Sequence, residues 1–386
     1  MAHLSCKDPF RQPVREMNSK VHPIVVVLVI LFTFLAIGVW MWGTGEAKKI
    51  GGPAELRMDL DGHLYIQIQN QLLEHDADGV FLVRHDLAKL GVESNLGTIA
   101  FFSDGDILLR RGPDPRTLSD NIRAYQRRTN EQSLIPQSPD TGLYRCDLDT
   151  TTCMLFGSKG IDFKAAHSIF IDWRTDEVYI TDTTRHLLRK YSANGEALTE
   201  PVAGFKFPNQ LLMHEGRLLI VNTNYHQIRV VDPSTESFGE ELDAIDVVPG
   251  VGTAAGQTWP SHIARVGEEW WVNNMRTGMN EGGIYIFDDN WRYDRKVTLP
   301  PRADPISLIS FRDEVLISDW NNDRIHRISS RGEPLKDFAS PGLDQVVAES
   351  RTARRQFEMY SYGGIALFFL LIVGLIVRGV ATSMSS

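Results

Sequence analysis

The chain has 386 residues, of which 42% are hydrophobic, and its formal net charge is −9. This hydrophobic share is enough for a globular core, and the length allows a fold of roughly 250 residues with further segments around it. The negative charge argues against nucleic-acid binding, because phosphate contacts need clustered Lys and Arg side chains.

The first predicted element is a transmembrane helix over residues 23–43, preceded by a tail of residues 1–22. Its uncharged run, Ile24–Trp42, is long enough to cross a hydrocarbon core about 30 Å thick. Trp40 and Trp42 stand at its end, where indole rings favour the membrane interface. A cleaved signal peptide is the alternative, but the run is long for one and no clean small-residue cleavage site follows.

Residues 51–340 contain six similar units. Four align readily and begin at Ala165, Phe207, Trp259 and Asp304; two looser units begin at Pro53 and Leu96, the second resuming at Thr141. Each has a short apolar strand, a polar turn, a second strand that often ends in Asp or Asn, and two more strands. Four short strands in a period of about 40 residues are typical of a propeller blade. The predicted fold class is therefore all-β, a six-bladed β-propeller flanked by transmembrane helices.

This pattern resembles the NHL repeat family, most clearly in PISLISFRDEVLISDWNNDRIHRISSRGE (Pro305–Glu333). The resemblance covers residues 51–340. It implies a six-bladed propeller but no particular activity, because propellers carry many unrelated functions.

Two of the three cysteines lie in the second unit. Cys146 and Cys153 flank a DLDTT turn, where opposed residues of a hairpin approach within disulfide range, whereas Cys6 lies on the N-terminal tail. A disulfide would put the propeller on an oxidising, extracytoplasmic side and the tails 1–22 and 379–386 in the cytoplasm. Two reduced, half-buried thiols are the alternative. Lys and Arg are distributed too evenly about the hydrophobic segments to fix the orientation.

The long connections are predicted to share one face of the propeller. We label the strands of a blade a to d, so that the d–a and b–c connections form one face, the b–c face, and the a–b and c–d turns form the other, the a–b face. The insertions 112–141 and 275–282 are b–c connections, and 243–259 is a d–a connection. Both ends of the propeller also attach to the b–c face, so we expect this face to look toward the membrane and to carry the binding site.

Polar residues mark the b–c mouth of the predicted channel, at the start of strand a or the end of strand b: Glu55, His167, Asp182, Asn209, Asn222, His262, Asn274 and Asp319. Such a set of oxygen and imidazole groups suits Ca²⁺ or Zn²⁺. Glu55 in PAEL and Asn209 in PNQL are similar to parts of the metal site of gluconolactonase-type propellers, but the family's Arg-Asn-Asp segment is missing. His167, His186, His226 and His262 are similar to the histidines of NHL-type amidating lyases.

A structural role is the competing interpretation for the strand-b residues, because a polar side chain there can cap the following turn and because the feature recurs from blade to blade. Trp259 and Trp320 are candidate anchors for a partner at the b–c face, with packing between blades as the alternative.

The chain ends in a predicted linker helix (341–361), a second transmembrane helix (362–380) and a tail (381–386). Arg351, Arg354 and Arg355 of the linker can lie on anionic lipid headgroups or form an ordinary solvated face. A buried core helix is the alternative to the second span.

These features predict a two-pass protein of the plasma (inner) membrane with an extracytoplasmic or periplasmic propeller. We expect a binding or scaffold module for an integral membrane protein partner or an extracytoplasmic ligand, with membrane lipid as a further partner and no cofactor. The alternative is a metal-dependent hydrolase or lyase that uses Ca²⁺ or Zn²⁺, held by Glu55, Asn209, Asp319, His167 and His262.

Overall fold

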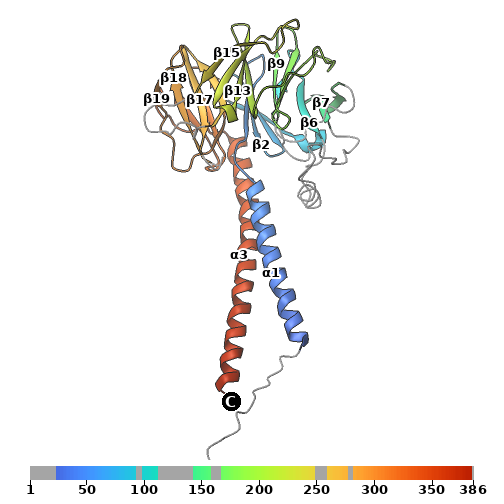
Figure 1. The fold of residues 1–386 in the computed structure, drawn as a ribbon, viewed down its shortest axis with the longest axis vertical. Helices are drawn as coiled ribbons and strands as arrows, with labels where there is room; N and C mark the ends of the chain where they lie inside the picture. Colours follow the sequence, from blue (N-terminus) through green and yellow to red (C-terminus); the bar gives the residue numbers. More distant parts are fainter. Residues whose placement is uncertain are drawn as a thin grey trace, which may run out of the picture. The chain divides into compact units, whose positions relative to one another are not determined.

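The computed structural model describes residues 23–92, 98–111, 142–157, 167–247, 259–276 and 281–384. The chain divides into two compact units. Residues 51–350 form one, and the segments up to residue 50 and from residue 351 form the other (Figure 1). The predicted insertion 112–141 and the tail with Cys6 lie outside the described residues.

The first unit is a six-bladed β-propeller, as predicted. Four blades have four described antiparallel strands. Blade 1 comprises β1 (Glu55–Met58), β2 (Leu64–Ile68), β3 (Gln71–His75) and β4 (Phe81–Asp86), and blade 2 comprises β5 (Ala100–Phe101), β6 (Ile107–Arg111), β7 (Gly142–Asp147) and β8 (Thr152–Leu155). Blade 4 comprises β12 (Pro208–His214), β13 (Arg217–Asn222), β14 (Gln227–Val231) and β15 (Glu241–Asp246). Blade 5 comprises β16 (Trp259–Val266), β17 (Glu269–Met275), β18 (Gly282–Phe287) and β19 (Tyr293–Lys296). The 3₁₀ turns η1 (Leu87–Leu90) and η2 (Thr223–Tyr225) follow β4 and β13.

Blades 3 and 6 have three regular strands each. Blade 3 comprises β9 (His167–Asp172), β10 (Glu177–Asp182) and β11 (Leu187–Tyr191), and blade 6 comprises β20 (Pro305–Phe311), β21 (Glu314–Asp319) and β22 (Arg324–Ser329). Their fourth segments are irregular but keep ladder contacts, such as the bridges Leu188↔Val202 and Ile328↔Pro334. The strand β15 extends to Asp246, so the predicted connection 243–259 begins later than the sequence indicates.

The cysteine prediction is confirmed. Cys146 and Cys153 stand opposite each other in the β7–β8 register and form a disulfide. The turn between them, DLDTT, is held by Asp147, whose carboxylate accepts hydrogen bonds from the backbone of Asp149 and Thr150.

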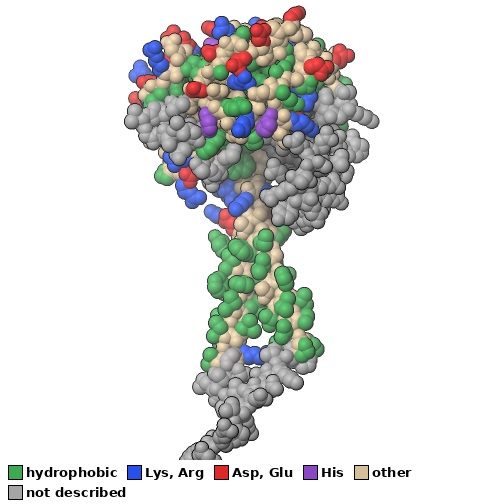
Figure 2. Space-filling model, in the orientation of Figure 1, with side chains coloured by type: hydrophobic (Ala, Val, Ile, Leu, Met, Phe, Trp, Pro, Cys, Tyr) green, Lys and Arg blue, Asp and Glu red, His purple; other side chains and the backbone are tan. Residues whose placement is uncertain are grey.

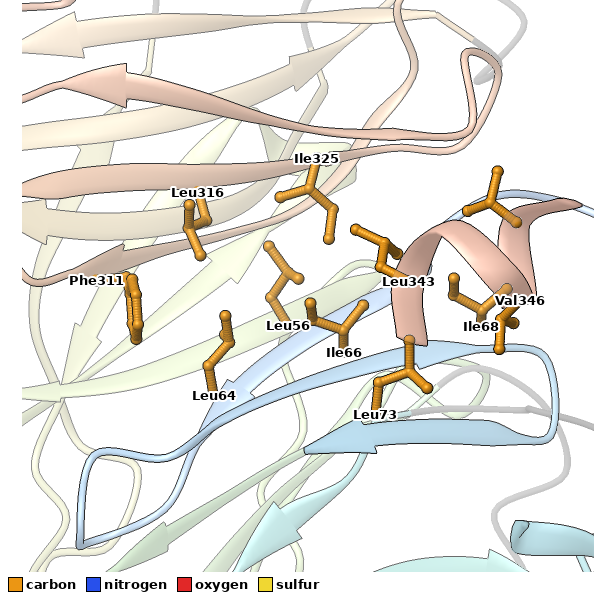
Figure 3. Packing of buried hydrophobic residues seen from close by; sticks show 11 residues of the cluster. Leu56, Leu64, Ile66, Ile68, Leu73, Phe311, Leu316, Ile325, Leu343 and Val346 are labelled. Atoms are coloured by element: carbon orange, nitrogen blue, oxygen red, sulfur yellow. The ribbon is translucent and has the colours of Figure 1, made fainter. Parts of the chain in front are cut away.

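The ring closes without a strand shared between its ends, because blade 1 is built entirely from residues 55–86 and blade 6 from residues after 304. Buried side chains of the two blades form one cluster (Figure 3), whose members include Leu56, Leu64, Ile66, Leu316 and Ile325. Among the described residues, hydrogen bonds also cross this seam, from Leu56 N to Ser307 Oγ (3.2 Å), from Gly52 N to Trp320 O (3.2 Å) and from Arg312 Nη1 to Asp78 O (3.4 Å). Closure therefore depends mainly on side-chain burial.

The start of helix α3 (Pro341–Met384) completes this seam. Leu343, Val346 and Val347 are buried in the closing cluster. Ser340 caps the helix by accepting a hydrogen bond from Leu343 N (3.2 Å), and its Oγ lies 2.8 Å from Nε2 of the buried His75. The first turns of α3 thus belong to the propeller core.

The second unit is an antiparallel pair formed by α1 (Pro23–Lys49) and the remainder of α3. Both helices are long and apolar enough to cross a membrane, and hydrophobic side chains cover them (Figure 2). The predicted linker helix and second span are parts of the single helix α3. Arg354 donates from Nε to Ile50 O (2.7 Å), so at least one linker arginine has a protein partner.

Small residues let the two helices approach closely. A Cβ atom on Gly43 would lie 2.7 Å from Phe357 O, and one on Gly364 would lie 2.6 Å from Trp40 N. Beside these contacts, the hydroxyl groups of Thr44 and Ser361 share a 2.8 Å hydrogen bond. Close backbone approach and hydroxyl bonds are the interactions that join helices in lipid, where the hydrophobic effect does not.

We expect Leu343→Ala to lower the free energy of unfolding by about 2–5 kcal/mol, because Leu343 is 4% exposed in the closing cluster. Leu242→Ala is the control, since Leu242 is 49% exposed on β15, and its cost should stay within about 0.5 kcal/mol. Denaturant titrations of both full-length variants measure the two values. Equal costs would mean that α3 does not support ring closure.

We expect Gly364→Ile to separate α1 from α3, whereas Gly363→Ile should not, because a Cβ on Gly363 meets nothing within 4 Å among the described residues. The measurement is the yield of an engineered disulfide between Thr44→Cys and Ser361→Cys, in a Cys6→Ser background in membranes. The yield should fall several-fold in Gly364→Ile and stay unchanged in Gly363→Ile. A similar yield in both would contradict the proposed helix contact.

Candidate functional site

The predicted b–c mouth residues lie at the strand ends where the sequence placed them. His167 stands opposite Asp182 in blade 3, and Pro305 stands opposite Asp319 in blade 6. In blades 4 and 5 the partners of Asn222 and Asn274 are prolines. Strand a then bulges in blades 4, 5 and 6, which moves Asn209 and His262 out of regular alternation.

Three of the strand-b residues have structural partners. Asp182 accepts a hydrogen bond from Arg185 N (3.0 Å), Asn222 accepts one from Lys206 N (2.7 Å), and Asp319 accepts one from Asp304 N (3.0 Å). These bonds hold the turns that follow or precede the strands, which is the capping role considered above. Asn274 differs, because its side-chain oxygen and nitrogen are buried and make no hydrogen bond with the described residues.

Neighbouring polar residues tie one blade to the next. Thr183 Oγ1 donates to Pro208 O (2.6 Å), Thr223 Oγ1 donates to Pro260 O (2.7 Å), and Asn273 Nδ2 donates to Pro305 O. In each case the end of strand b in one blade binds the start of strand a in the next. The sequence carried a signal for two of them, since a Thr follows the strand-b Asp or Asn in both blades 3 and 4.

The remaining candidates are not brought together. Asn209 donates to Thr223 Oγ1 (2.8 Å), His167 is buried, and His186 Nδ1 accepts from Phe207 N (3.0 Å). Trp259 lies beside the ring of His226, with centroids 5.8 Å apart. Within the described part of the chain, no three His, Cys, Asp or Glu side chains are grouped to hold a metal ion. A metal site at this mouth therefore stays a prediction.

Trp320 lies where the chain enters the propeller. A Cβ atom on Gly51 would lie 1.8 Å from its indole ring, so only glycine fits at this position. This contact supports the packing interpretation of Trp320, whose side chain is only partly exposed.

Asp319 also belongs to a buried charge network in blade 6. His326 Nε2 lies 3.0 Å from Asp319 Oδ2, and His326 Nδ1 lies 3.0 Å from Asp337 Oδ1. Burial lowers the pKa of His326, but the two carboxylates more than offset it, so the pKa lies above its ordinary value. The pKa of the nearby Asp304 is raised to about 6 by burial and by Asp319.

A second polar group is centred on Arg57 and ties blade 1 to the residues that lead into blade 2. Arg57 Nη2 is 3.1 Å from Glu55 Oε1, and Arg57 Nε donates to Ile99 O (3.0 Å). Burial raises the pKa of Glu55, although the charge of Arg57 opposes it. Burial, together with the charge of Arg57, lowers the pKa of His262 to about 3, so this imidazole is neutral at physiological pH. Sequence reasoning identified Glu55 and His262 but missed Arg57.

The a–b mouth of the channel is an apolar pocket, which we call the axial pocket. It has a volume of about 550 Å³ and is lined by strand-a residues of all six blades. Its apolar wall includes Met58, Phe170, Leu212 and Ile309, and Trp173 stands at its rim. Pockets of this size and character are typical of small-molecule sites. This mouth is opposite the one on which the sequence analysis placed its candidates.

Similarity to known proteins is limited to solved structures. No family model and no curated protein matches the chain. Among solved structures, it is similar to virginiamycin B lyase from Staphylococcus aureus, with 13% identity over 74% of this chain and 83% of that chain and a TM-score of 0.48. It is also similar to a putative 6-phosphogluconolactonase from Bacteroides uniformis, with 13% identity over 73% and 82% and a TM-score of 0.43. At these values the likeness concerns the propeller fold alone.

We expect His326→Gln to destabilise the protein by about 2–3 kcal/mol at pH 5.5, because a charged imidazole bonded to two carboxylates is lost. The raised pKa means that this contribution is complete below the unfolded-state value of about 6.5 and is lost as pH rises through the folded-state value. The measurement is the difference in unfolding free energy between wild type and variant from pH 5.5 to 9. Asp304 is present in both proteins, so its own titration largely cancels in the difference between wild type and variant.

His214→Gln is the control for this experiment, because His214 lies on β12, away from Asp319 and Asp337. Its stability difference should be small across the range. A His326→Gln difference that does not change with pH would contradict a charged His326.

Proposed function

We propose that this chain is a membrane-anchored binding module whose NHL-like propeller engages an integral membrane protein through its b–c face. One observation carries the proposal: both ends of the propeller lie at this face. Gly51 packs on Trp320 at the end of β21, and Ser350 shares a 3.3 Å hydrogen bond with Gln69 just after β2. The described strand ends that flank 112–141, 248–258 and 277–280 lie on the same face.

Attachment of the propeller to a candidate membrane helix at each end favours a binding role at the membrane. Two candidate membrane spans, one before and one after the propeller in the chain, would keep the propeller at a high effective concentration near membrane partners. The b–c face also exposes side chains suited to a protein contact. Tyr225 in η2 is 51% exposed and lies under the ammonium group of Lys206, 5.6 Å from the ring centroid. Tyrosine is enriched at protein interfaces, and a cation over its ring is held by a cation–π interaction.

The proposed side of the membrane is extracytoplasmic. The Cys146–Cys153 disulfide supports it, because such bonds persist in oxidising compartments. With an even number of spans, both tails would then be cytoplasmic.

We expect a photo-crosslinking residue at Tyr225 to capture a membrane protein in intact membranes, whereas one at Glu215 should not. Glu215 follows β12 on the a–b face, and its side chain is 80% exposed, so burial would not account for a lack of capture from this position. Mass spectrometry of the crosslinked bands identifies the partner. Capture of membrane proteins only from position 215 would contradict the proposed binding face.

A further inference from the structure

The axial pocket has no role in the function proposed above. It lies at the a–b mouth, away from the strand ends where the chain enters and leaves the propeller. Because its wall is made by strands of a closed ring, it is held by the scaffold itself. Its rim is apolar as well, with Leu60 54% exposed. Trp173 is fixed there by a hydrogen bond from its Nε1 to Phe101 O (2.8 Å).

The charged residues of the pocket are unbalanced. Three arginines line it, Arg57, Arg174 and Arg265, against one carboxylate, Asp172. Asp172 is engaged by Arg174 through two hydrogen bonds (3.0 and 2.8 Å). The acidic partners of the other two arginines, Glu55 and Asp289, do not line the pocket.

Two of these arginines retain unused hydrogen-bonding capacity. Arg265 Nη1 is buried and makes no hydrogen bond with the residues that the structure describes, whereas Arg57 Nη2 is paired with Glu55 Oε1 at 3.1 Å but without the geometry of a hydrogen bond. A buried guanidinium nitrogen without an acceptor costs free energy, which an anionic ligand would recover.

We propose that the axial pocket binds a small amphipathic anion, with its apolar body against Met58, Phe170, Leu212 and Ile309. Its acidic head, a carboxylate or a group of similar shape, pairs with Arg57. Arg265 supplies a second donor. The size of the pocket, its apolar wall and its excess of arginines all fit this class of ligand.

The test uses the full-length protein in lipid nanodiscs, with empty nanodiscs subtracted. Naphthalene-2-carboxylate is the acidic probe, and 2-naphthylmethanol is its neutral match. Calorimetric titration should show the acid binding at least about tenfold more tightly than the alcohol, since a charge-assisted hydrogen bond in a buried site is worth a factor of this size.

Two pairs of variants test separately how the arginine charge and the apolar wall contribute to the binding of the probes. In Glu55→Gln/Arg57→Met the preference for the acid should disappear, whereas Glu55→Gln alone should retain it. Ile309→Trp fills the pocket and should weaken both probes about tenfold. Leu82→Trp, on the exposed face of β4, should weaken neither. Thermal unfolding of each variant confirms that it is folded.

Three results would overturn the proposal: no binding of the acid to the wild type, equal binding of acid and alcohol, or binding that Ile309→Trp leaves unchanged. None of them affects the crosslinking from Tyr225, so failure of this site and failure of the b–c face are distinguishable.

Discussion

The propeller depends on burial at the seam between blades 1 and 6. In a ring closed by a shared strand, backbone hydrogen bonds lock the two ends, but here each blade is continuous in sequence. The seam is held by a hydrophobic cluster that includes Leu56, Leu316 and Leu343. Since Leu343 belongs to α3, the helix that continues into the second unit also completes the ring. Hydrophobic packing of this kind is strong but not directional, so directional bonds such as that from Leu56 N to Ser307 Oγ add specificity to the seam.

The same closure gives the two mouths of the channel different characters. At the b–c mouth, polar side chains are used to join blades, as in the bonds from Thr183 and Thr223 to the prolines of the next blade. These bonds stabilise the scaffold, whereas the side-chain oxygen and nitrogen of Asn274 make no hydrogen bond with the described residues. At the a–b mouth the strand-a residues leave an open apolar pocket, and Trp173 Nε1 donates to Phe101 O between blades 3 and 2. The proposed protein contact and the proposed small-molecule site therefore lie at opposite ends of the channel.

The sequence predicts the parts of this structure that depend on local chemistry. Blade number and strand order follow from the turns and the strand pattern, and the disulfide follows from the opposed positions of Cys146 and Cys153 in one hairpin. The inter-blade bond of Thr223 was missed, because nothing local says that it reaches Pro260 O. The effect of the Arg57 charge on the pKa of His262 was missed for a stronger reason. The two residues are about 200 positions apart in the chain, in blades 1 and 5, and the effect exists only once the ring has closed.

The buried pair Glu55–Arg57 is not explained by stability. In the strand register Arg57 stands opposite Tyr65, and the equivalent positions in other blades hold Phe170, Leu212 and Ile309. An apolar residue therefore satisfies the fold at this position. A buried ion pair commonly contributes no more than the apolar residues that could replace it, because desolvation offsets the attraction between its charges. A ligand anion at the pocket floor accounts for an arginine there, and the acidic Glu55 beside it keeps that arginine's charge compensated when the pocket is empty.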